Sequence, residues 1–212
     1  MDLVETKPAT LLPQIDGEYD PEHLKTFTQK RDSASAIYVE IGSGSGGHLI
    51  GRALKQPDAL FIGFELRYKR AFRTAEKAEK EGLTNLVVVR GDAQSLPTLF
   101  ENSKVDGYYI NFPDPWGKKH WKKHRLINTE YLQVLHRYLR PGGFLAYKTD
   151  HHEYFLSGES VIRDSTLFEV TERTEDLHSS EYLADNITTE FESLFLSKGL
   201  PICFLRAVRS AA

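Results

Sequence analysis

The sequence predicts an α/β fold in which helices cover both faces of a doubly wound, mostly parallel sheet, giving three layers. From Ala36 onward, short apolar runs rich in β-branched and aromatic residues alternate with amphipathic stretches. A glycine-rich turn follows the first run, and acidic residues follow later runs, at the points where open α/β sheets bind ligands. Strand–helix alternation of this kind implies right-handed crossovers and a parallel sheet.

The runs that predict strands are Ile37–Ile41, Leu60–Glu65, Leu86–Arg90, Val105–Ile110 and Phe144–Lys148. Two further strands are expected at Phe168–Thr171 and Ile202–Val208. The stretches that predict helices lie near His48–Lys55, Tyr68–Glu81, Thr129–Leu139 and Glu190–Lys198. Pro141-Gly142-Gly143 is expected to end the third helix. Residues 1–35 have scattered prolines and little periodicity, so we expect a partly ordered arm before one domain, residues 36–212.

Composition narrows the class of protein. The 212 residues contain no apolar stretch near the roughly 20 residues that span a bilayer, and the N-terminus lacks signal-peptide features. Cys203 is the one cysteine, which excludes an internal disulfide and a cysteine-rich metal site. A cytoplasmic protein is the simplest interpretation. The net charge of −3 argues against a nucleic-acid partner, but positive charge is concentrated between Lys118 and Arg125.

The glycine-rich turn predicts a nucleotide-like cofactor. Gly42, Gly44 and Gly47 fit the dinucleotide spacing G-x-G-x-x-G, and an acidic residue, Glu65, follows 18 residues later. A nicotinamide site and a plain connecting turn both fit that spacing. Three acids, Glu40, Glu65 and Asp92, favour S-adenosylmethionine, whose sulfonium and ammonium suit an acidic pocket and which has no phosphate. Each acid taken singly also fits a loop residue or a helix cap.

The segment Ile110–Arg125, which begins with the last residue of the fourth predicted strand, is the most informative in the chain. Pro113 and Pro115 restrict the backbone around Asp114 at the carboxyl end of the fourth predicted strand. Trp116 offers a flat ring for stacking on a base, and the cations after it suit phosphates. The alternative interpretation makes Asp114 a turn former and the lysine run a solvated face.

The motif Asn-Phe-Pro-Asp-Pro-Trp, Asn111–Trp116, followed by a basic cluster, resembles the signature of bacterial tRNA (guanine-N7-)-methyltransferases. The resemblance extends from about Tyr38 to Arg206. Its other matching segments are Val39–Gly46, Gly63–Leu66, Arg90–Ala93, Lys148–Asp150 and Thr189–Glu192. It implies a class I methyltransferase fold, Rossmann-like with a seven-stranded sheet. It also implies S-adenosylmethionine as methyl donor, tRNA as partner, and N7 of a variable-loop guanine as acceptor.

Carried over by position, the resemblance implies a catalytic Asp114. It also implies that four acids bind the cofactor, namely Glu40, Glu65, Asp92 and Asp114. Gly42 and Gly44 of the glycine-rich turn complete the predicted cofactor-binding set. The implied tRNA-binding residues are Lys118, His120, Trp121, Lys122, Lys123, His124, Arg125, Asp150, Thr189, Glu190, Phe191 and Glu192. Two residues depart from the family pattern: Gly117 stands where a proline is expected, and Trp121 interrupts the basic cluster.

Several alternatives stay open on the sequence alone. Thr189 and Glu192 also form the Thr-x-x-Glu pattern of a capping box. His151-His152-Glu153 suits the start of a helix better than a metal site, and we predict no bound metal. The competing functions are a methyltransferase acting on a small molecule or protein, a non-catalytic RNA-binding subunit of this fold, and, more distantly, a nicotinamide oxidoreductase.

Overall fold

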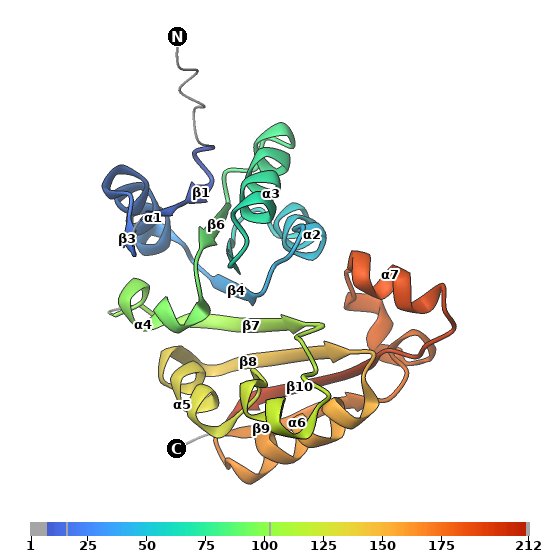
Figure 1. Ribbon diagram of the computed structural model, residues 1–212. Coiled ribbons are helices and arrows are strands. Elements are labelled where there is room, and N and C mark those ends of the chain that lie inside the picture. The colour runs from blue at the N-terminus through green and yellow to red at the C-terminus, as the bar shows by residue number, and fades with distance from the viewer. Residues whose placement is uncertain (1–7, 16, 102, 211–212) are drawn as a thin grey trace. The chain divides into compact units, whose positions relative to one another are not determined.

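The computed structural model describes residues 8–15, 17–101 and 103–210, apart from the side chains of Ile15, Lys119 and Lys122. These residues form two compact units, one up to Leu96 and one from Pro97, so that the division falls within α4 (Leu96–Leu99) (Figure 1). In the described part of the chain, no helix combines the length and the apolar character that crossing a membrane requires.

The sheet of unit 1 is parallel and contains the first three predicted strands. They are β4 (Ile37–Ile41), β5 (Leu60–Glu65) and β6 (Leu86–Arg90), with β5 in the middle. All three have the predicted bounds. A strand that the pattern did not predict, β1 (Leu11–Leu12), pairs in parallel with the outer edge of β6.

Two helices cover one side of this sheet, α2 (Gly47–Lys55) and α3 (Tyr68–Lys80) (Figure 1). Alanines give α3 a flat inner face, so the helix packs closely on the strands. The apolar core there consists of Leu11, Leu49, Ala53, Ala59, Phe61, Ala71, Ala75, Ala78, Leu86 and Val88. After β6 comes a 3₁₀ turn, η1 (Ala93–Ser95).

The segment predicted as a partly ordered arm contains regular structure. After β1 come a small hairpin of β2 (Gln14–Ile15) and β3 (Glu18–Tyr19), and then α1 (Pro21–Ser33). Asp20 caps α1 by accepting a hydrogen bond from the His23 amide at 3.1 Å. The strands have only two residues each, which is too short to show a period of apolar residues. In α1 the buried residue is Phe27, so the helix has no apolar stripe that the sequence would reveal. Residues 1–7 of the predicted arm lie outside the described residues.

The sheet of unit 2 is mixed. Its strands are β7 (Val105–Asn111), β8 (Leu139–Thr149), β10 (Cys203–Arg209) and β9 (Phe168–Thr174), in that spatial order. β7 and β8 run parallel, whereas β10 is antiparallel to both β8 and β9. The register sets Asn111 beside Lys148 at the carboxyl ends of β7 and β8.

The helices of unit 2 are α5 (Thr129–Tyr138), α6 (His152–Asp164) and α7 (Glu190–Leu196). Its 3₁₀ turns are η2 (Lys119–His124), η3 (Leu177–Ser179) and η4 (Glu181–Asp185). Buried aromatic rings join α6 to the sheet, since the Tyr147 ring lies 5.8 Å from that of Tyr154 and 6.1 Å from that of Phe155. Burial raises the pKa of both tyrosines.

Two expectations about strands need correction. The described residues contain four strands in the sheet of each unit, eight in all where seven were expected; β1 belongs to the segment predicted as an arm. β8 also begins at Leu139, so Pro141-Gly142-Gly143 lies within the strand. A register shift between Val105 and Gly107 of β7 accommodates this irregular start, and Gly142 adopts a φ of 77°.

Candidate functional site

The glycine turn after β4 is built for close approach to a ligand. Gly42 donates to the Phe64 carbonyl at 3.0 Å, which ties the turn to the end of β5. Gly42, Gly44 and Gly46 have φ angles of 78°, 56° and 82°, a region that glycine adopts without strain. A Cβ at Gly42 or Gly44 would meet no atom within 4 Å. A Cβ at Gly46 would lie 2.2 Å from Thr74 Cγ2. Gly42 and Gly44 therefore border open space, whereas Gly46 leaves the room that the Thr74 side chain of α3 occupies.

Glu65, at the end of β5, is held in place by main-chain amides. Its Oε2 accepts from the Gly44 amide at 2.9 Å, and its Oε1 accepts from the Arg67 amide at 2.8 Å. The residue is 7% exposed. A carboxylate oxygen has two lone pairs, so each retains capacity for a further donor such as a ribose hydroxyl. The carboxylate is thus oriented before any ligand arrives.

Glu40 faces α2 from inside β4. The residue is buried, and its Oε2 lies 3.2 Å from His48 Nδ1. Arg52 Nε donates to His48 Nε2 at 3.3 Å. These buried groups fasten α2 to β4 beside the turn. Contact between Glu40 and a cofactor stays a prediction.

Asp92 follows β6 and is exposed, and its Oδ1 accepts from the Gln94 amide at 2.9 Å. The structure therefore brings Asp92, Glu65 and the glycine turn to the carboxyl ends of three adjacent strands of unit 1. Beside them, Ser43 Oγ is buried and, within the described residues, has no hydrogen-bond partner. Two carboxylates and open backbone fit a cationic nucleoside better than a pyrophosphate.

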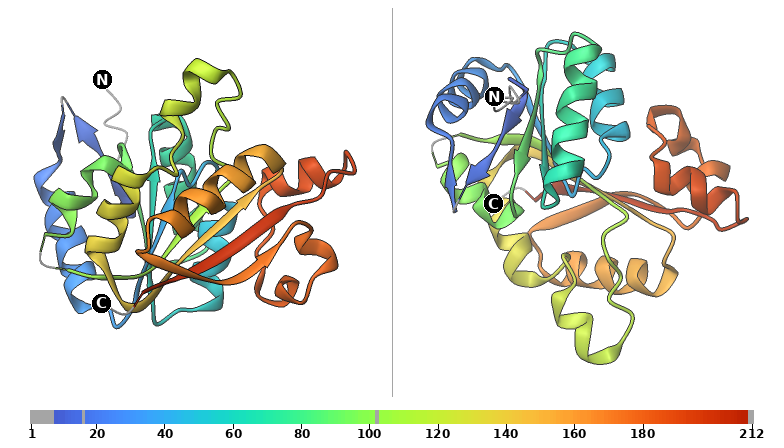
Figure 2. Two further views of the ribbon diagram at one scale, coloured as in Figure 1. Left: turned by 90° about the horizontal axis from the view of Figure 1, so that it is seen from below. Right: turned by 45° about the horizontal axis from the view of Figure 1, so that its top comes forward.

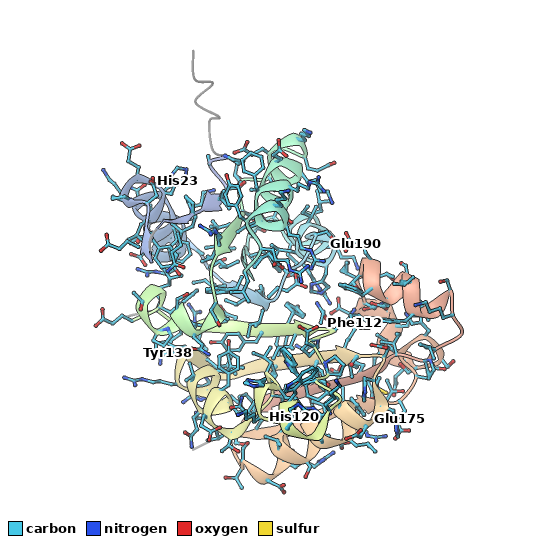
Figure 3. The ribbon with its side chains drawn as sticks, viewed as in Figure 1. His23, Phe112, His120, Tyr138, Glu175 and Glu190 are labelled. Atoms are coloured by element: carbon cyan, nitrogen blue, oxygen red, sulfur yellow. The ribbon has the colours of Figure 1, made fainter. Side chains whose placement is uncertain are left out.

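In unit 2, the loop after β7 carries Asp114 between two aromatic residues in the left-handed region. Phe112 has a φ of 51° and Trp116 a φ of 43°. This region costs a residue with a Cβ about 1–2 kcal/mol, so neighbouring contacts have to hold it. The Phe112 amide donates to the Lys148 carbonyl at 2.8 Å. Figure 3 shows Phe112 at the carboxyl end of β7. Asp114 itself is exposed.

Arg125 holds the other side of the same loop. Its Nε donates to the Pro115 carbonyl at 2.8 Å, and an Nη donates to Ser157 Oγ of α6 at 2.7 Å. The guanidinium also lies over the Tyr154 ring, 4.6 Å from its centroid. Arg125 is buried, whereas Lys118, His120, Lys123 and His124 of the same segment are exposed. The structure therefore gives it a role in shaping the loop, and its predicted contact with RNA stays untested.

Aromatic rings and cations gather in the remainder of this segment, which lies beside α6 in both views of Figure 2. Trp116 and Trp121 meet edge to face at 6.0 Å and are 36% and 40% exposed. The His124 ring lies 5.6 Å from that of Trp116, and Lys118 Nζ lies 4.7 Å from the Trp121 ring centroid. His120 and Lys123 are exposed, and the Lys122 side chain lies outside the described residues. Exposed rings beside cations suit unpaired bases and phosphates.

Asp150 lies at the same edge of the sheet of unit 2 as the loop. It is the first residue after β8, it is half-buried, and β8 runs parallel to β7. Asp150 and Asp114 thus each follow the carboxyl end of a strand, as predicted, and the structure shows that these two strands are neighbours.

The Thr189–Glu192 segment forms the capping box that the sequence offered as an alternative. Thr189 Oγ1 accepts from the Glu192 amide at 2.9 Å, and Glu192 Oε2 accepts from the Thr189 amide at 3.3 Å. Glu192 is fully enclosed, whereas Glu190 and Phe191 are exposed. Substrate binding by this segment stays a prediction.

The partner of Glu192 was not predicted from the sequence. Lys148 Nζ lies 2.7 Å from Glu192 Oε2, and the Lys148 side chain is 5% exposed. A lysine at the end of an otherwise apolar strand was the available signal, because lysine is almost never fully buried without a partner.

His151 begins α6, as predicted, by accepting from the Tyr154 amide through Nδ1 at 3.2 Å. Among the described residues, no group of three or more His, Cys, Asp or Glu side chains is placed to hold a metal ion.

The chain is similar in sequence to known methyltransferases. A family model described as putative methyltransferase matches residues 34–205. The tRNA (guanine-N(7)-)-methyltransferase of Bdellovibrio bacteriovorus is 36% identical over 177 residues, which is 84% of either chain. The enzyme of that name from Lachnoclostridium phytofermentans is 37% identical over 193 residues, 90% of this chain and 89% of the relative.

Solved structures resemble the chain as well. The crystal structure of the 16S rRNA methyltransferase KamB has a TM-score of 0.69 at 16% identity, covering 95% of this chain and 99% of that one. A variant 16S rRNA (adenine(1408)-N(1))-methyltransferase with cosubstrate SAM, from Catenulisporales acidiphilia, has a TM-score of 0.62 at 19% identity, covering 96% of each chain. At such identities the likeness bears on fold alone, and it confirms the predicted α/β class.

Proposed function

Because the chain belongs to the tRNA (guanine-N(7)-)-methyltransferase family, we propose that it transfers a methyl group from S-adenosylmethionine to N7 of a guanine in the variable loop of tRNA. The observation that carries this proposal is the sequence relationship, which extends over most of both chains. The Asn111–Arg125 segment adds chemistry of its own, since it joins an exposed carboxylate to exposed tryptophans and cations.

The residues of unit 1 fit S-adenosylmethionine, which supplies an electrophilic methyl group on a cationic sulfur. Glu65 is oriented to accept hydrogen bonds from ribose hydroxyls. Asp92 is exposed at the next strand end, where it can bond the adenine or its ribose. Gly42 and Gly44 leave open space beside the backbone. Glu40 adds negative charge close behind the turn.

The chemistry at the acceptor requires positioning more than proton transfer. Guanine N7 has a lone pair and no proton, so no general base is needed there. Asp114 is proposed to accept hydrogen bonds from the guanine N1–H and exocyclic amine, which fixes the purine for in-line attack. Positive charge grows on the purine as the methyl group arrives, and a fixed carboxylate stabilises it. Asp150 offers a second contact to this base or its neighbour.

The exposed cations and rings of the loop are proposed to hold the tRNA. Lys118, His120, Lys123 and His124 suit phosphates, and Trp116 and Trp121 suit unstacked bases. Affinity for tRNA should therefore fall steeply as salt rises. We propose a cytoplasmic location, where tRNA is modified.

The test is to incubate the purified chain with an unmodified tRNA transcript and methyl-labelled S-adenosylmethionine, and then to map the label. Label on one variable-loop guanine is the expected result. The matched control is the same tRNA with 7-deazaguanine at that position, in which a C–H replaces N7. Equal labelling of this control would refute N7 as the acceptor. No transfer to tRNA, despite measured binding of S-adenosylmethionine, would refute tRNA as the substrate.

Asp114→Ala is expected to lower the rate constant of methyl transfer about 100- to 1000-fold, because it removes a group that acts on charge developing in the transition state. Single-turnover methylation at saturating tRNA measures the effect. Asp164→Ala, an exposed change at the end of α6, is the matched control and should keep full activity. Normal methylation by Asp114→Ala would overturn the assignment of Asp114.

A further inference from the structure

Lys148 connects two parts of unit 2 that carry predicted substrate residues. Its main-chain carbonyl accepts from the Phe112 amide at the start of the Asp114 loop, and its side chain binds Glu192 of α7. We propose that Lys148 is a positioning residue which, through its buried ion pair with Glu192, fixes α7 and thereby the loop that carries Asp114. The effect on catalysis rests on the proposed function, but the effect on the loop does not.

The ammonium of Lys148 donates hydrogen bonds to three acceptors of the chain itself. Nζ donates to Glu192 Oε2 at 2.7 Å, to Asn186 Oδ1 at 2.8 Å and to the Ile187 carbonyl at 3.1 Å. The side chain is 5% exposed. These acceptors lie just before α7 or within it, so the ammonium anchors both the helix and the segment that leads into it.

Glu192 completes the cluster from the other side. Its Oε1 accepts from Asn186 Nδ2 at 2.6 Å and lies 2.7 Å from His178 Nε2. Burial on its own raises the pKa of the Glu192 carboxyl, but the charge of Lys148 and the hydrogen bonds from Lys148, His178 and Asn186 outweigh it. The pKa is therefore lowered, and the carboxylate stays ionised in a fully enclosed position.

Aromatic residues of α7 pack against the start of the loop. The Phe195 ring packs on the Phe112 ring at a centroid distance of 5.6 Å, and the Phe191 ring stacks on Phe195 at 6.2 Å. Lys148 thus holds Phe112 in two ways, by its own carbonyl and through α7. Phe112 has a φ of 51° and stands two residues before Asp114, so the strained start of the loop depends on these contacts.

An ion pair suits this role better than an apolar pair. Buried ion pairs add little net stability compared with apolar residues of the same volume, whereas removing one partner strands a buried charge and is strongly destabilising. An ammonium that donates to several acceptors fixes the positions of those acceptors relative to one another, because hydrogen bonds are directional. An apolar side chain has no such directional bonds. The double variant Lys148→Met/Glu192→Leu therefore keeps the volume and the neutrality of the site but loses its directional bonds.

The chain offers a direct readout of the loop, because both of its tryptophans, Trp116 and Trp121, lie there. The test compares the double variant with wild type by acrylamide quenching of tryptophan fluorescence, by thermal unfolding, and by kcat for tRNA methylation. The matched control is Arg140→Met/Asp106→Leu. It removes an ion pair between an Arg140 Nη and Asp106 Oδ1, 3.4 Å apart, near the amino ends of β8 and β7 and so at the end of the strands away from the loop.

The double variant is expected to stay folded, to be quenched about twofold more strongly, and to lose about 10- to 100-fold in kcat, because small misplacement of a reacting group has effects of that size. The control should match wild type in quenching and in kcat. Unchanged quenching in the folded double variant would overturn the inference, whatever its kcat. Increased quenching with full kcat would overturn the catalytic part. If wild type does not methylate tRNA, the proposed function fails, and quenching still decides whether Lys148 orders the loop.

Discussion

The turn after β4 and the loop after β7 both place polar groups at the carboxyl end of a strand, and both use backbone in the left-handed region. The turn does so with Gly42, Gly44 and Gly46. The loop does so with Phe112 and Trp116, which have large side chains. Glycine adopts this conformation at little cost, whereas an aromatic residue adopts it only when its surroundings require it.

The conformation of the turn is therefore set by its own residues, whereas that of the loop is set by tertiary contacts. The turn needs little outside its own sequence, and its hydrogen bonds to the end of β5 supplement a conformation that glycine already allows. The loop is held by residues outside its strained turn, with Lys148 of β8 at one side and Arg125, ten residues after Pro115, at the other. Changes within the glycine turn should therefore act mainly on stability and cofactor binding, and changes to these contacts should act on the order of the loop.

The largest expected effect is that of Gly46→Ala. The added methyl group would lie 2.2 Å from Thr74 Cγ2, and alanine would also have to adopt a φ of 82°. Overpacking and backbone strain together should lower the free energy of unfolding by about 2–4 kcal/mol. Urea denaturation measures the change.

Gly44→Ala is the matched control for Gly46→Ala, because its methyl group would meet no atom within 4 Å and the cost is strain alone. We expect about 1 kcal/mol there. Adding Thr74→Ala to Gly46→Ala should recover part of the stability, since it removes two of the three contacting atoms. Equal losses for Gly44→Ala and Gly46→Ala would contradict the role assigned to Thr74.

Arg125→Met tests the tertiary control of the loop. It removes the hydrogen bonds to the Pro115 carbonyl and to Ser157, which should lower the free energy of unfolding by about 1–3 kcal/mol and make the tryptophans easier to quench. Arg125→Lys should not restore the wild-type values, because an ammonium lacks the planar fork of a guanidinium.

The control for Arg125→Met is Arg137→Met, at an exposed site on α5. If Arg125→Met left stability and quenching unchanged but weakened tRNA binding, Arg125 would be an RNA contact, as the family resemblance implies, rather than a residue that shapes the loop.

The smallest expected effect concerns pH. The pKa of Glu192 is lowered from its ordinary value of 4.5 in the folded chain, so the unfolded chain binds the proton more readily. Glu192 therefore stabilises the fold fully above pH 4.5, and this contribution is lost as the pH falls below that value through the folded pKa. Unfolding by urea, followed between about pH 6 and pH 3, should show a shallower loss of stability for Glu192→Gln than for wild type. Glu190→Gln, its exposed neighbour, should keep the wild-type slope.

Much of the fold was readable from local patterns. The strands β4, β5 and β6 have the predicted bounds, because short apolar runs rich in β-branched and aromatic residues and bounded by turns leave few alternatives. The bounds of α2, α3 and α5 were predicted to within one residue. β1 was not predicted, because two residues carry no periodicity and their strand character depends on pairing with β6.

The candidate site divides in the same way. The sequence by itself determined the glycine turn, the acids at the strand ends, the Asn111–Arg125 motif and the capping box at Thr189, since each depends on neighbouring residues and local backbone geometry. Only the tertiary structure decided that Arg125 is buried against Pro115 and Tyr154, and that Lys148 is paired with Glu192, 44 residues away. Whether a charged side chain meets a ligand or another side chain depends on what the fold brings beside it, because desolvating a charge requires a partner that local sequence does not specify.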